Sequence, residues 1–573
     1  MSSAFTFDLK IINGLIIDGT GNPGFHGDLG IRAGLLVAVG AAPGTARQTI
    51  DAKGHVVAPG FIDIHTHYDA QVIWDRMLTI SPWHGVTTAV IGNCGFSVAP
   101  TRPAHREIII RTLENVEGMT VAALQAGLGV DWPFETFPEY LDAVQARGIG
   151  INIGAFIGHT ALRTYVLGED ATERAATPAE VAAMQGLVVE AMRAGALGFA
   201  TSKAVTHVGY RGKPVPSRAA DFSEMLMLAA AVGAAGCGGV IQATIGPELT
   251  FERFAELNTV SGCPVTWTAL LAGTALTKEG TFEQLARSEQ LLRDGFQVFP
   301  QVTPRPLNFE FQLAAPFIFE SMRMFKPVSE ADHEGKKRLY ADPEFRAQLW
   351  ERLDKKAPAL FRSGFRDTVI TEVPGRPELS ERKLFEVAAE LGVTPVDVLF
   401  DLGLATDLKA RFRTPVANHA EDEVELLLKS PATVLGLSDA GAHASQLCDA
   451  SLTTYLFKRW VREKKVLTLE QAVRMTTARL AEVVGIYDRG RLAEGLAADI
   501  VIFDPETIGD EPLRRVYDLP GGADRLISDA RGIDAVIVNG QLLRQDNQDM
   551  VDVNGPLPGQ VLRNGRGRVA SCA

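Results

Sequence analysis

The sequence predicts an α/β protein whose main unit is a distorted (β/α)8 TIM barrel. Short apolar segments with strand character alternate with helix-like segments along most of the chain, which is typical of a parallel sheet with helical connections. Eight such segments can be distinguished, the number of strands in a TIM barrel. The 573 residues exceed what one hydrophobic core usually holds, so we expect a second packed unit beside the barrel.

The eight predicted barrel strands are spread along the chain, with helices expected between several of them. Two of these helices are predicted at Pro178–Ala194 and Ser223–Gly236. In a TIM barrel the chemistry lies at the carboxyl ends of the strands, so residues that follow a strand are candidates for a site. The predicted strands are Val56–Ile64, Thr87–Ile91, Gly150–Phe156, Ala196–Thr201, Gly239–Ala243, Val265–Leu270, Gln297–Val302 and Thr433–Leu437.

Both ends of the chain are predicted to form one small β-sandwich, made of residues 1–57 and 484–573. The N-terminal part consists of short strands separated by turn signals such as Asn13-Gly14, and it is too short to bury a core alone. The C-terminal part supplies strands that can complete it. The candidate strands are Asp8–Ile12, Leu15–Ile17, Leu35–Val39, Ala498–Phe503 and Ile533–Val538.

The barrel domain is expected over residues 58–483, with an insertion at about 304–430 before the last strand. This stretch is long for one connection in a compact domain. It contains helix-like segments at Asp342–Lys355, Arg382–Gly392 and Pro395–Leu404. The sequence leaves three roles open for this insertion, which are a lid, a specificity wall and an oligomer contact.

The composition limits the partners and the cellular location that we expect for the protein. A formal net charge of −13 argues against a nucleic-acid-binding surface. The first residues lack a basic region followed by a long apolar stretch, and no apolar run reaches about 18 residues, so we expect neither a signal peptide nor a membrane span. Five scattered cysteines fit reduced thiols better than a disulfide framework. We therefore expect a cytoplasmic protein that binds neither nucleic acid nor membrane.

The most informative stretch is Val56–Asp69, in which a buried strand ends in His65-Thr66-His67. Residues i and i+2 of a strand point to the same face. His65 and His67 would therefore project together from the end of the strand, as two imidazole ligands for a divalent metal. The alternative is a pair of structural polar residues at the barrel mouth.

An acidic residue, Asp439, follows the last predicted strand in the motif Leu435-Gly436-Leu437-Ser438-Asp439. At that position it would face the same centre as His65 and His67. Its expected roles are metal ligand and acceptor of a proton from the attacking water. The alternative is a helix N-cap, because Ser-Asp-Ala-Gly is favourable capping chemistry.

Several motifs spread over nearly the whole chain share one family resemblance. They are PGFIDIHTHYD, SPWHGVTTAVIGNCGFSVAP, FIGHTALR, ALGFATS, LGLSDAGAH and ARLAEVVGIYDRGRLAEGLAADIVIFD. Together they resemble the amidohydrolase superfamily, and in particular its N-acyl-D-amino-acid deacylase branch. The resemblance implies a metal-dependent hydrolase of amide bonds other than peptide bonds, with a small acyl amide, most simply an N-acyl-D-amino acid, as substrate.

The resemblance also implies a ligand set. Cys94, after the second barrel strand, matches a cysteine that binds metal in the family, and an ordinary buried thiol is the alternative. The family places one histidine after strand five and another after strand six. Val240–Ile245 and Val265–Leu270 contain none, so we expect one Zn²⁺ ion rather than two.

Four further residues are candidates for the site. His159 is expected to act in catalysis as a hydrogen bonder or oxyanion stabiliser, with a structural histidine as the alternative. Lys203, His207 and Arg211 follow the fourth strand and are predicted to bind substrate. Lys203 or Arg211 would hold an anionic group, whereas a solvated charge is the alternative. A carboxylated Lys203 that bridges two metals is disfavoured without the ligands of strands five and six.

The function expected from the sequence is therefore metal-dependent amide hydrolysis by a homo-oligomer. Two alternatives stay open at this point. The same metal site could cleave a cyclic amide, a carbamate or a lactone, or the barrel could be a non-catalytic scaffold. The missing histidines favour the scaffold, whereas His65, His67 and Asp439 oppose it.

Overall fold

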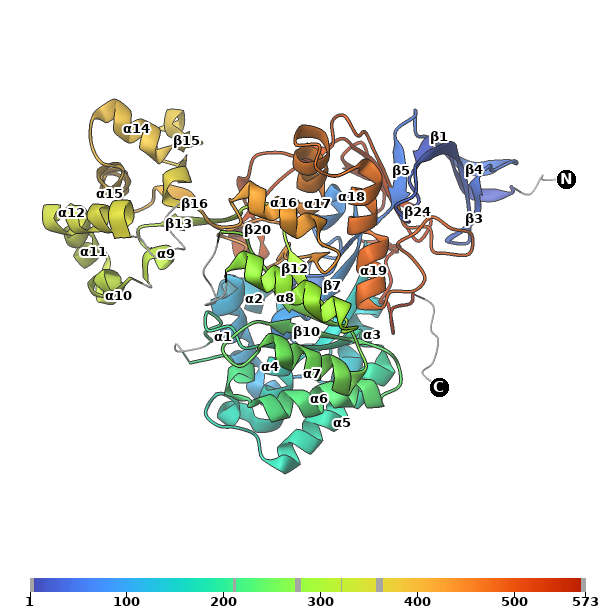
Figure 1. Cartoon of the computed structure of the whole chain (residues 1–573), viewed down its shortest axis with the longest axis horizontal. Helices are drawn as coiled ribbons and strands as arrows, with labels where there is room; N and C mark the ends of the chain where they lie inside the picture. Colours follow the sequence, from blue (N-terminus) through green and yellow to red (C-terminus); the bar gives the residue numbers. More distant parts are fainter. Residues whose placement is uncertain (1–4, 210–212, 274–279, 321, 357–363, 568–573) are drawn as a thin grey trace.

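The computed structural model describes residues 5–209, 213–273, 280–320, 322–356 and 364–567. Figure 1 shows a central barrel with its helices, an insertion on one side and a sheet built from the chain ends on the other. Within the described residues, no helix is long and apolar enough to cross a membrane.

The central unit is an eight-stranded parallel sheet with the order β17-β12-β11-β10-β9-β8-β7-β6. All eight predicted strands are present, which confirms the distorted TIM barrel. Beyond the ends of β6 and β17 the chain closes the ring through a parallel bridge between Thr66 and Ala440. The strands are β6 (Phe61–Asp63), β7 (Val86–Ile91), β8 (Asn152–Gly158), β9 (Gly198–Ser202), β10 (Val240–Thr244), β11 (Val265–Thr268), β12 (Val298–Val302) and β17 (Val434–Leu435).

Helices surround this barrel and follow their sequence signals closely. The helix α5 occupies the predicted range Pro178–Ala194, because Thr177 and Glu180 form a capping box at its start and Gly195 ends it in the left-handed region. The helices are α1 (Arg106–Glu117), α2 (Val121–Leu128), α3 (Phe137–Arg147), α4 (His159–Leu167), α5, α6 (Phe222–Ala234), α7 (Phe251–Ser261), α8 (Thr281–Arg293), α16 (Glu421–Lys429), α17 (Leu452–Tyr455), α18 (Leu469–Thr476) and α19 (Ala478–Val484).

The predicted strand Val56–Ile64 is divided between two sheets, which corrects the sequence-based expectation. Its first part is β5 (Val56–Pro59), which belongs to the sheet of the chain ends, and its second part is β6 of the barrel. Gly60 lies at the junction, where an added Cβ would come within 2.2 Å of Thr87 Oγ1. Only glycine allows the two sheets to approach this closely here.

Strands from both ends of the chain form a single nine-stranded sheet with the order β25-β24-β23-β18-β5-β1-β2-β3, in which β4 also pairs with β1. This sheet buries its own apolar core, which includes Leu9, Ile31, Ile500 and Ile537. The strands are β1 (Phe7–Ile16), β2 (Phe25–Arg32), β3 (Leu35–Gly40), β4 (Ala46–Asp51), β18 (Ile500–Phe503), β23 (Ile533–Val538), β24 (Gln541–Gln545) and β25 (Gln548–Asp549).

Two details of this region differ from the prediction. The segments predicted as separate strands, Asp8–Ile12 and Leu15–Ile17, lie largely in one strand, β1, whose register shifts between Ile11 and Gly14. Two short hairpin-like pairs also accompany the sheet; their strands are β19 (Gly509–Asp510), β20 (Arg514–Leu519), β21 (Ala523–Ile527) and β22 (Ala530–Arg531).

The insertion forms a small unit with its own sheet, ordered β13-β16-β14-β15, and its own hydrophobic core (yellow in Figure 1). Phe311, Phe319, Leu399 and Phe412 belong to that core. The elements are β13 (Leu307–Gln312), α9 (Phe317–Glu320), α10 (Lys326–Glu330), α11 (His333–Ala341), α12 (Pro343–Glu351), β14 (Val369–Glu372), β15 (Arg382–Lys383), α14 (Leu384–Leu391), α15 (Pro395–Ala405) and β16 (Arg411–Ala417).

The cysteines match the expectation of reduced thiols only in part. Cys94, Cys263 and Cys448 are buried free thiols. Cys237 is disulfide-bonded, so the expectation is wrong at that position.

A buried polar network joins the barrel to the terminal sheet. Arg489 and Asp499 form an ion pair of 2.5 Å, and both residues are buried. The same carboxylate accepts hydrogen bonds from the Asn152 side chain (2.8 Å) and from the backbone of Asn539 (2.7 Å). Asn152 starts barrel strand β8, whereas Asn539 follows β23, so Asp499 connects two sheets that are far apart in sequence.

We expect Asp499→Ala to destabilise the protein by about 1–3 kcal/mol, because it removes one of the two carboxylate partners of the buried Arg489, leaving Asp488, and also removes the acceptor of the Asn539 backbone N–H. Thermal unfolding would show this as a large drop in melting temperature. The matched control is Glu494→Ala, an exposed acid in the same segment, which should change the melting temperature little. Equal effects of the two substitutions would contradict the connecting role of Asp499.

Candidate metal centre

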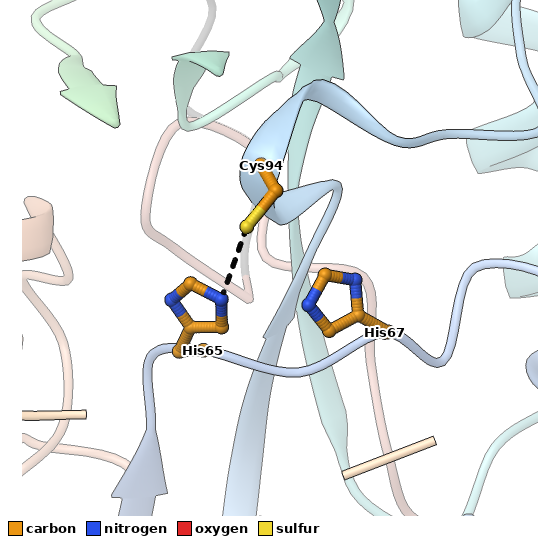
Figure 2. A group of neighbouring side chains, drawn as sticks. All are labelled: His65, His67 and Cys94. Carbon is orange, nitrogen blue, oxygen red and sulfur yellow. Dashed lines mark hydrogen bonds between the residues drawn. The ribbon is translucent and has the colours of Figure 1, made fainter. Parts of the chain in front are cut away.

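His65 and His67 lie just beyond β6, on the strand extension that closes the barrel. Two backbone hydrogen bonds fix this extension to the segment after β17, from Asp439 to the His65 carbonyl (3.1 Å) and from His67 to the Ala440 carbonyl (2.8 Å). Both side chains are buried, and their ring centroids lie 5.3 Å apart. Figure 2 shows the two imidazoles side by side, as the i, i+2 spacing predicts.

Cys94 completes a compact group of three ligand atoms. It lies in a short turn after β7, where Gly92 and Cys94 both adopt positive φ angles, of 84° and 56°. The backbone N–H of Cys94 donates to the Gln242 side chain at 2.7 Å. Its sulfur points toward the imidazoles and lies 3.4 Å from His65 Nε2 (Figure 2). One ligand atom from each of His65, His67 and Cys94 lies within 4.8 Å of the other two.

Asp439 approaches the same group from the end of the last strand. Its carboxylate oxygen Oδ1 lies 3.3 Å from His65 Nε2 and 3.7 Å from His67 Nε2. The next described helix, α17, starts only at Leu452, so Asp439 does not cap a helix. The N-cap alternative is therefore wrong.

The outward-facing nitrogen of each histidine is held by a buried polar side chain. Gln301 Oε1 lies 2.7 Å from His65 Nδ1, and because an amide oxygen can only accept, Nδ1 carries the hydrogen. Glu117 Oε1 lies 3.1 Å from His67 Nδ1, an ion-pair distance without the geometry of a hydrogen bond. Both contacts leave Nε2 directed at Asp439 and Cys94, as metal-binding histidines require.

Sequence reasoning missed both of these supporting residues. Gln301 did carry a signal, since it is a polar residue inside the otherwise apolar strand β12. Glu117 carried none, because it is the last residue of α1 and looks like any acid on a helix.

The charges of the site favour the ionised forms of Cys94 and Asp439, and the same neighbouring charges raise the pKa of His65 and His67. Burial alone would raise the pKa of the Cys94 thiol, but His65 and His67 lower it to about 7. Burial also opposes ionisation of Asp439, yet the two histidines hold its pKa well below the usual range. Two imidazoles, a thiol near its ionisation point and a carboxylate form a donor set that suits Zn²⁺. The residues present therefore fit a divalent metal.

A cavity of about 130 Å³ opens beside these residues. It includes Thr244 and Thr268, the last residues of β10 and β11. The two hydroxyls lie 3.2 Å apart. The remaining lining comes from Phe96, Val116, Glu117, His207, Ala269, Leu437 and His443, together with His65, His67, Cys94 and Asp439.

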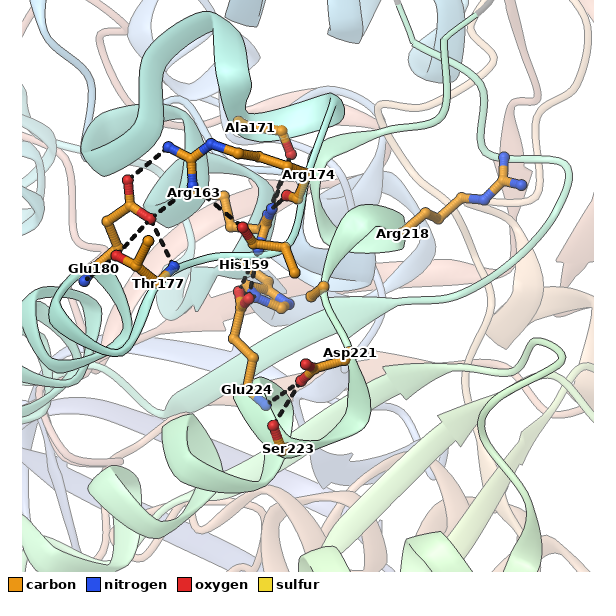
Figure 3. Close-up of polar contacts among 12 residues, drawn as sticks. His159, Arg163, Ala171, Arg174, Thr177, Glu180, Arg218, Asp221, Ser223 and Glu224 are labelled. Carbon is orange, nitrogen blue, oxygen red and sulfur yellow. Dashed lines mark hydrogen bonds and ion pairs between the residues drawn. The ribbon is translucent and has the colours of Figure 1, made fainter.

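His159, predicted to act in catalysis, does not line this cavity. Its Nδ1 lies 2.8 Å from the Thr201 hydroxyl and its Nε2 lies 2.9 Å from Glu224. Glu224 also forms an ion pair with Arg163 at 2.5 Å, and all three residues are buried (Figure 3). Both ring nitrogens are thus engaged by the protein, which is the arrangement of the structural alternative. A direct role of His159 in catalysis stays a prediction.

The predictions for the three substrate-binding residues have different outcomes. Lys203 turns away from the cavity: its ammonium group donates to the carbonyls of Arg218 and Ala220 and pairs with Glu248. His207 does line the cavity. Arg211 lies outside the described residues.

A buried imidazole–thiol group beside a carboxylate, at the carboxyl ends of the strands of a (β/α)8 barrel, defines a metal-dependent hydrolase. The comparison with known families agrees, since the Amidohydrolase family matches residues 48–544. The chain belongs to the amidohydrolase family. It is a metal-dependent hydrolase of carbon–nitrogen bonds other than peptide bonds.

Individual relatives resemble the chain over nearly its whole length. An uncharacterized protein of Mycobacterium tuberculosis is 31% identical, over 88% of this chain and 86% of its own. A D-aminoacylase of Alcaligenes xylosoxydans xylosoxydans is 29% identical, over 95% and 96%. Among solved structures, an N-acyl-D-glutamate deacylase of Bordetella bronchiseptica, complexed with zinc and a phosphonate inhibitor, has a TM-score of 0.66 and 28% identity, covering 97% of this chain and 99% of that one.

We expect Glu117→Gln to weaken Zn²⁺ binding by about 10–100-fold, because it removes the charged partner that orients His67. Competition with a chromophoric chelator measures this affinity directly. Glu114→Gln, on the same helix but half-exposed beside Arg111, is the matched control and should leave the affinity unchanged. Equal affinities in both variants would show that the Glu117–His67 contact does not support the metal.

Proposed function

We propose that the protein removes the acyl group from N-acyl-D-amino acids or closely related acyl amides, with a single Zn²⁺ ion. The observation that carries this proposal is the convergence of His65, His67, Cys94 and Asp439 at the barrel mouth, in a chain that is similar over 95% of its length to a D-aminoacylase. His65, His67 and Asp439 would hold the ion, with Cys94 as a further ligand. A bound ion would supply Lewis-acid activation of water and of the acyl carbonyl.

Asp439 is the residue of this group that can move a proton. It is unprotonated in the working pH range, and its oxygen lies beside both histidines. In the proposed reaction Asp439 accepts one proton as the water oxygen bonds to the acyl carbon. When the carbon–nitrogen bond breaks, Asp439 returns that proton to the nitrogen, which leaves as an amine.

The choice of substrate rests on the relatives. The D-aminoacylase and an N-acyl-D-glutamate deacylase of the same organism, 30% identical over 93% of both chains, are named for acylated D-amino acids. They support D-stereochemistry and an acyl-amino-acid substrate. Cyclic amides, carbamates and lactones receive no comparable support, and neither does a scaffold without catalysis.

The residues of the cavity wall support the prediction of one metal ion rather than two. Thr244 and Thr268 hydrogen-bond each other where two histidines would hold a second ion, and a neutral hydroxyl is a poor zinc ligand. A D-aminoacylase structure is described in terms of a binuclear centre with one-metal activation and second-metal attenuation. One ion is therefore compatible with the chemistry of a relative.

The oligomeric state and the cellular location of the protein also stay predictions. A homo-oligomer would be tested by light scattering after size-exclusion chromatography. A cytoplasmic location would be tested by cell fractionation, and the disulfide at Cys237 does not support it.

The proposed substrate class is tested on a panel. After dialysis and addition of one equivalent of Zn²⁺, we expect hydrolysis of N-acetyl-D-amino acids and much slower hydrolysis of their L-isomers, a hydantoin, a carbamate and a lactone. Chelation should abolish the activity. Preference for any other member of the panel would overturn the proposed substrate.

Metal analysis of the same dialysed protein provides the second readout. About one ion per chain is expected, and two tightly bound ions would overturn the single-ion proposal. Cys94→Ser tests the thiol, since an unchanged metal content would show that Cys94 is not a direct ligand.

We expect Asp439→Asn to reduce kcat at least about a hundredfold, in line with the usual contribution of general acid–base catalysis, while KM changes less. The matched control is Asp294→Asn, an exposed residue at the end of α8 before β12, which should leave kcat unchanged. If kcat of Asp439→Asn stays within a few-fold of the wild type, the proton acceptor lies elsewhere.

A further inference from the structure

His207 occupies the cavity wall next to the turn that carries Cys94. It follows β9, and its ring packs against Phe96 at a centroid distance of 5.0 Å. Both residues line the same cavity as the candidate metal ligands. His207 thus lines the candidate substrate cavity, unlike His159, whose two ring nitrogens are held by Thr201 and Glu224.

One nitrogen of His207 is fixed by the end of β9. Its Nδ1 lies 2.6 Å from the hydroxyl of Ser202. The same hydroxyl oxygen accepts the backbone N–H of Ala204 at 3.2 Å. The Ser202 hydroxyl carries one hydrogen and two lone pairs, so it can donate to Nδ1 while it accepts from Ala204. With Nδ1 as the acceptor, the hydrogen of the neutral ring resides on Nε2.

In that tautomer the Nε2–H is available to a ligand. Within the described residues, no protein group makes a hydrogen bond to His207 Nε2, whereas Nδ1 is bonded to Ser202. Burial lowers the pKa of His207 to about 3, and His443 and His67 act in the same direction, so the ring is neutral. A neutral imidazole with a free N–H is a hydrogen-bond donor and neither a base nor an acid here.

Such a donor would add to the stabilisation that a bound ion supplies at the acyl oxygen. When water bonds to the acyl carbon, the electron pair of the C=O bond moves onto that oxygen, and a donor placed in advance stabilises the charge. Two further hydroxyls on the cavity wall, those of Thr244 and Thr268, also have to be considered as donors. Thr268 donates to Thr244 and accepts from Gln242, so its hydroxyl is already engaged.

We propose that His207 is a catalytic residue that donates a hydrogen bond from Nε2 to the acyl oxygen as negative charge develops there, and that Ser202 is the positioning residue that sets its tautomer. The proton stays on His207 throughout, so no bond of the imidazole breaks. The proposal rests on the proposed function, since it names the donor for the same amide hydrolysis. It replaces the role that the sequence favoured for His159.

The test compares three variants on an N-acetyl-D-amino acid. His207→Leu should reduce kcat by about 10²–10³-fold, the usual cost of losing one oxyanion donor. His207→Gln should keep more activity, because its amide N–H can reach the position of Nε2. Ser202→Ala should fall between them, because the tautomer is no longer fixed. His333→Gln, an exposed histidine on α11, is the control and should match the wild type.

Two readouts separate catalysis from a structural effect. Zn²⁺ content and melting temperature should equal those of the wild type in His207→Gln and Ser202→Ala. The affinity for a phosphonate analogue of the tetrahedral state should fall by the same factor as kcat/KM across the variants, while KM changes little. Parallel losses in metal content would instead assign His207 a structural or ligand role and overturn the proposal.

The outcomes also separate this proposal from the proposed function. If the wild type cleaves the substrate and Asp439→Asn does not, but His207→Leu and His207→Gln keep kcat within about five-fold, the function stands and the His207 proposal is wrong. A wild type inactive on the whole panel would overturn the proposed function and the role of His207 with it.

Discussion

The candidate centre depends on one main-chain contact, the closure of the barrel between the extensions of β6 and β17. His65 and His67 lie on one extension and Asp439 on the other, and the hydrogen bonds that close the barrel run between these same residues and Ala440. Ser438 adds a side-chain bond to the His65 carbonyl at 2.9 Å. Because backbone groups this deep must be paired, the fold and the ligand spacing are stabilised by the same bonds.

Buried polar side chains then orient the ligands from outside. Gln301 holds His65, Glu117 holds His67 and Gln242 holds the backbone of Cys94. Each buried polar group would be costly if left unpaired, so the network favours one arrangement of the centre. Three elements distant in sequence, α1, β10 and β12, thereby support a group built on β6 and β7. The site is organised by the protein before any ligand binds.

The insertion is coupled to the mouth of the barrel by an apolar contact. Leu437, which lines the cavity, packs in one cluster with Leu271 and with Val416 at the end of β16. Phe309 of β13 also stacks edge-on against His443, another cavity residue, at a centroid distance of 5.7 Å. The insertion has its own core, yet two of its strands, the edge strand β13 and its neighbour β16, reach the wall of the cavity. The insertion was expected to act as a lid, as a wall that determines substrate specificity or as an oligomer contact. These contacts favour the role of a specificity wall.

The sequence by itself determined the barrel and the pair His65 and His67. The periodicity of apolar residues and the turn signals predict the strands and helices, and the i, i+2 rule predicts that the two imidazoles lie together. All of these are local properties of the chain. Eight strands and helix α5 could be predicted for this reason. Tertiary structure alone decided where strand ends meet and where side chains turn. It placed Gln301 and Glu117 behind the histidines, split one predicted strand at Gly60, and turned Lys203 and His159 toward partners far away in sequence. A position after a strand brings a residue to the barrel mouth, but long-range contacts choose which way it points.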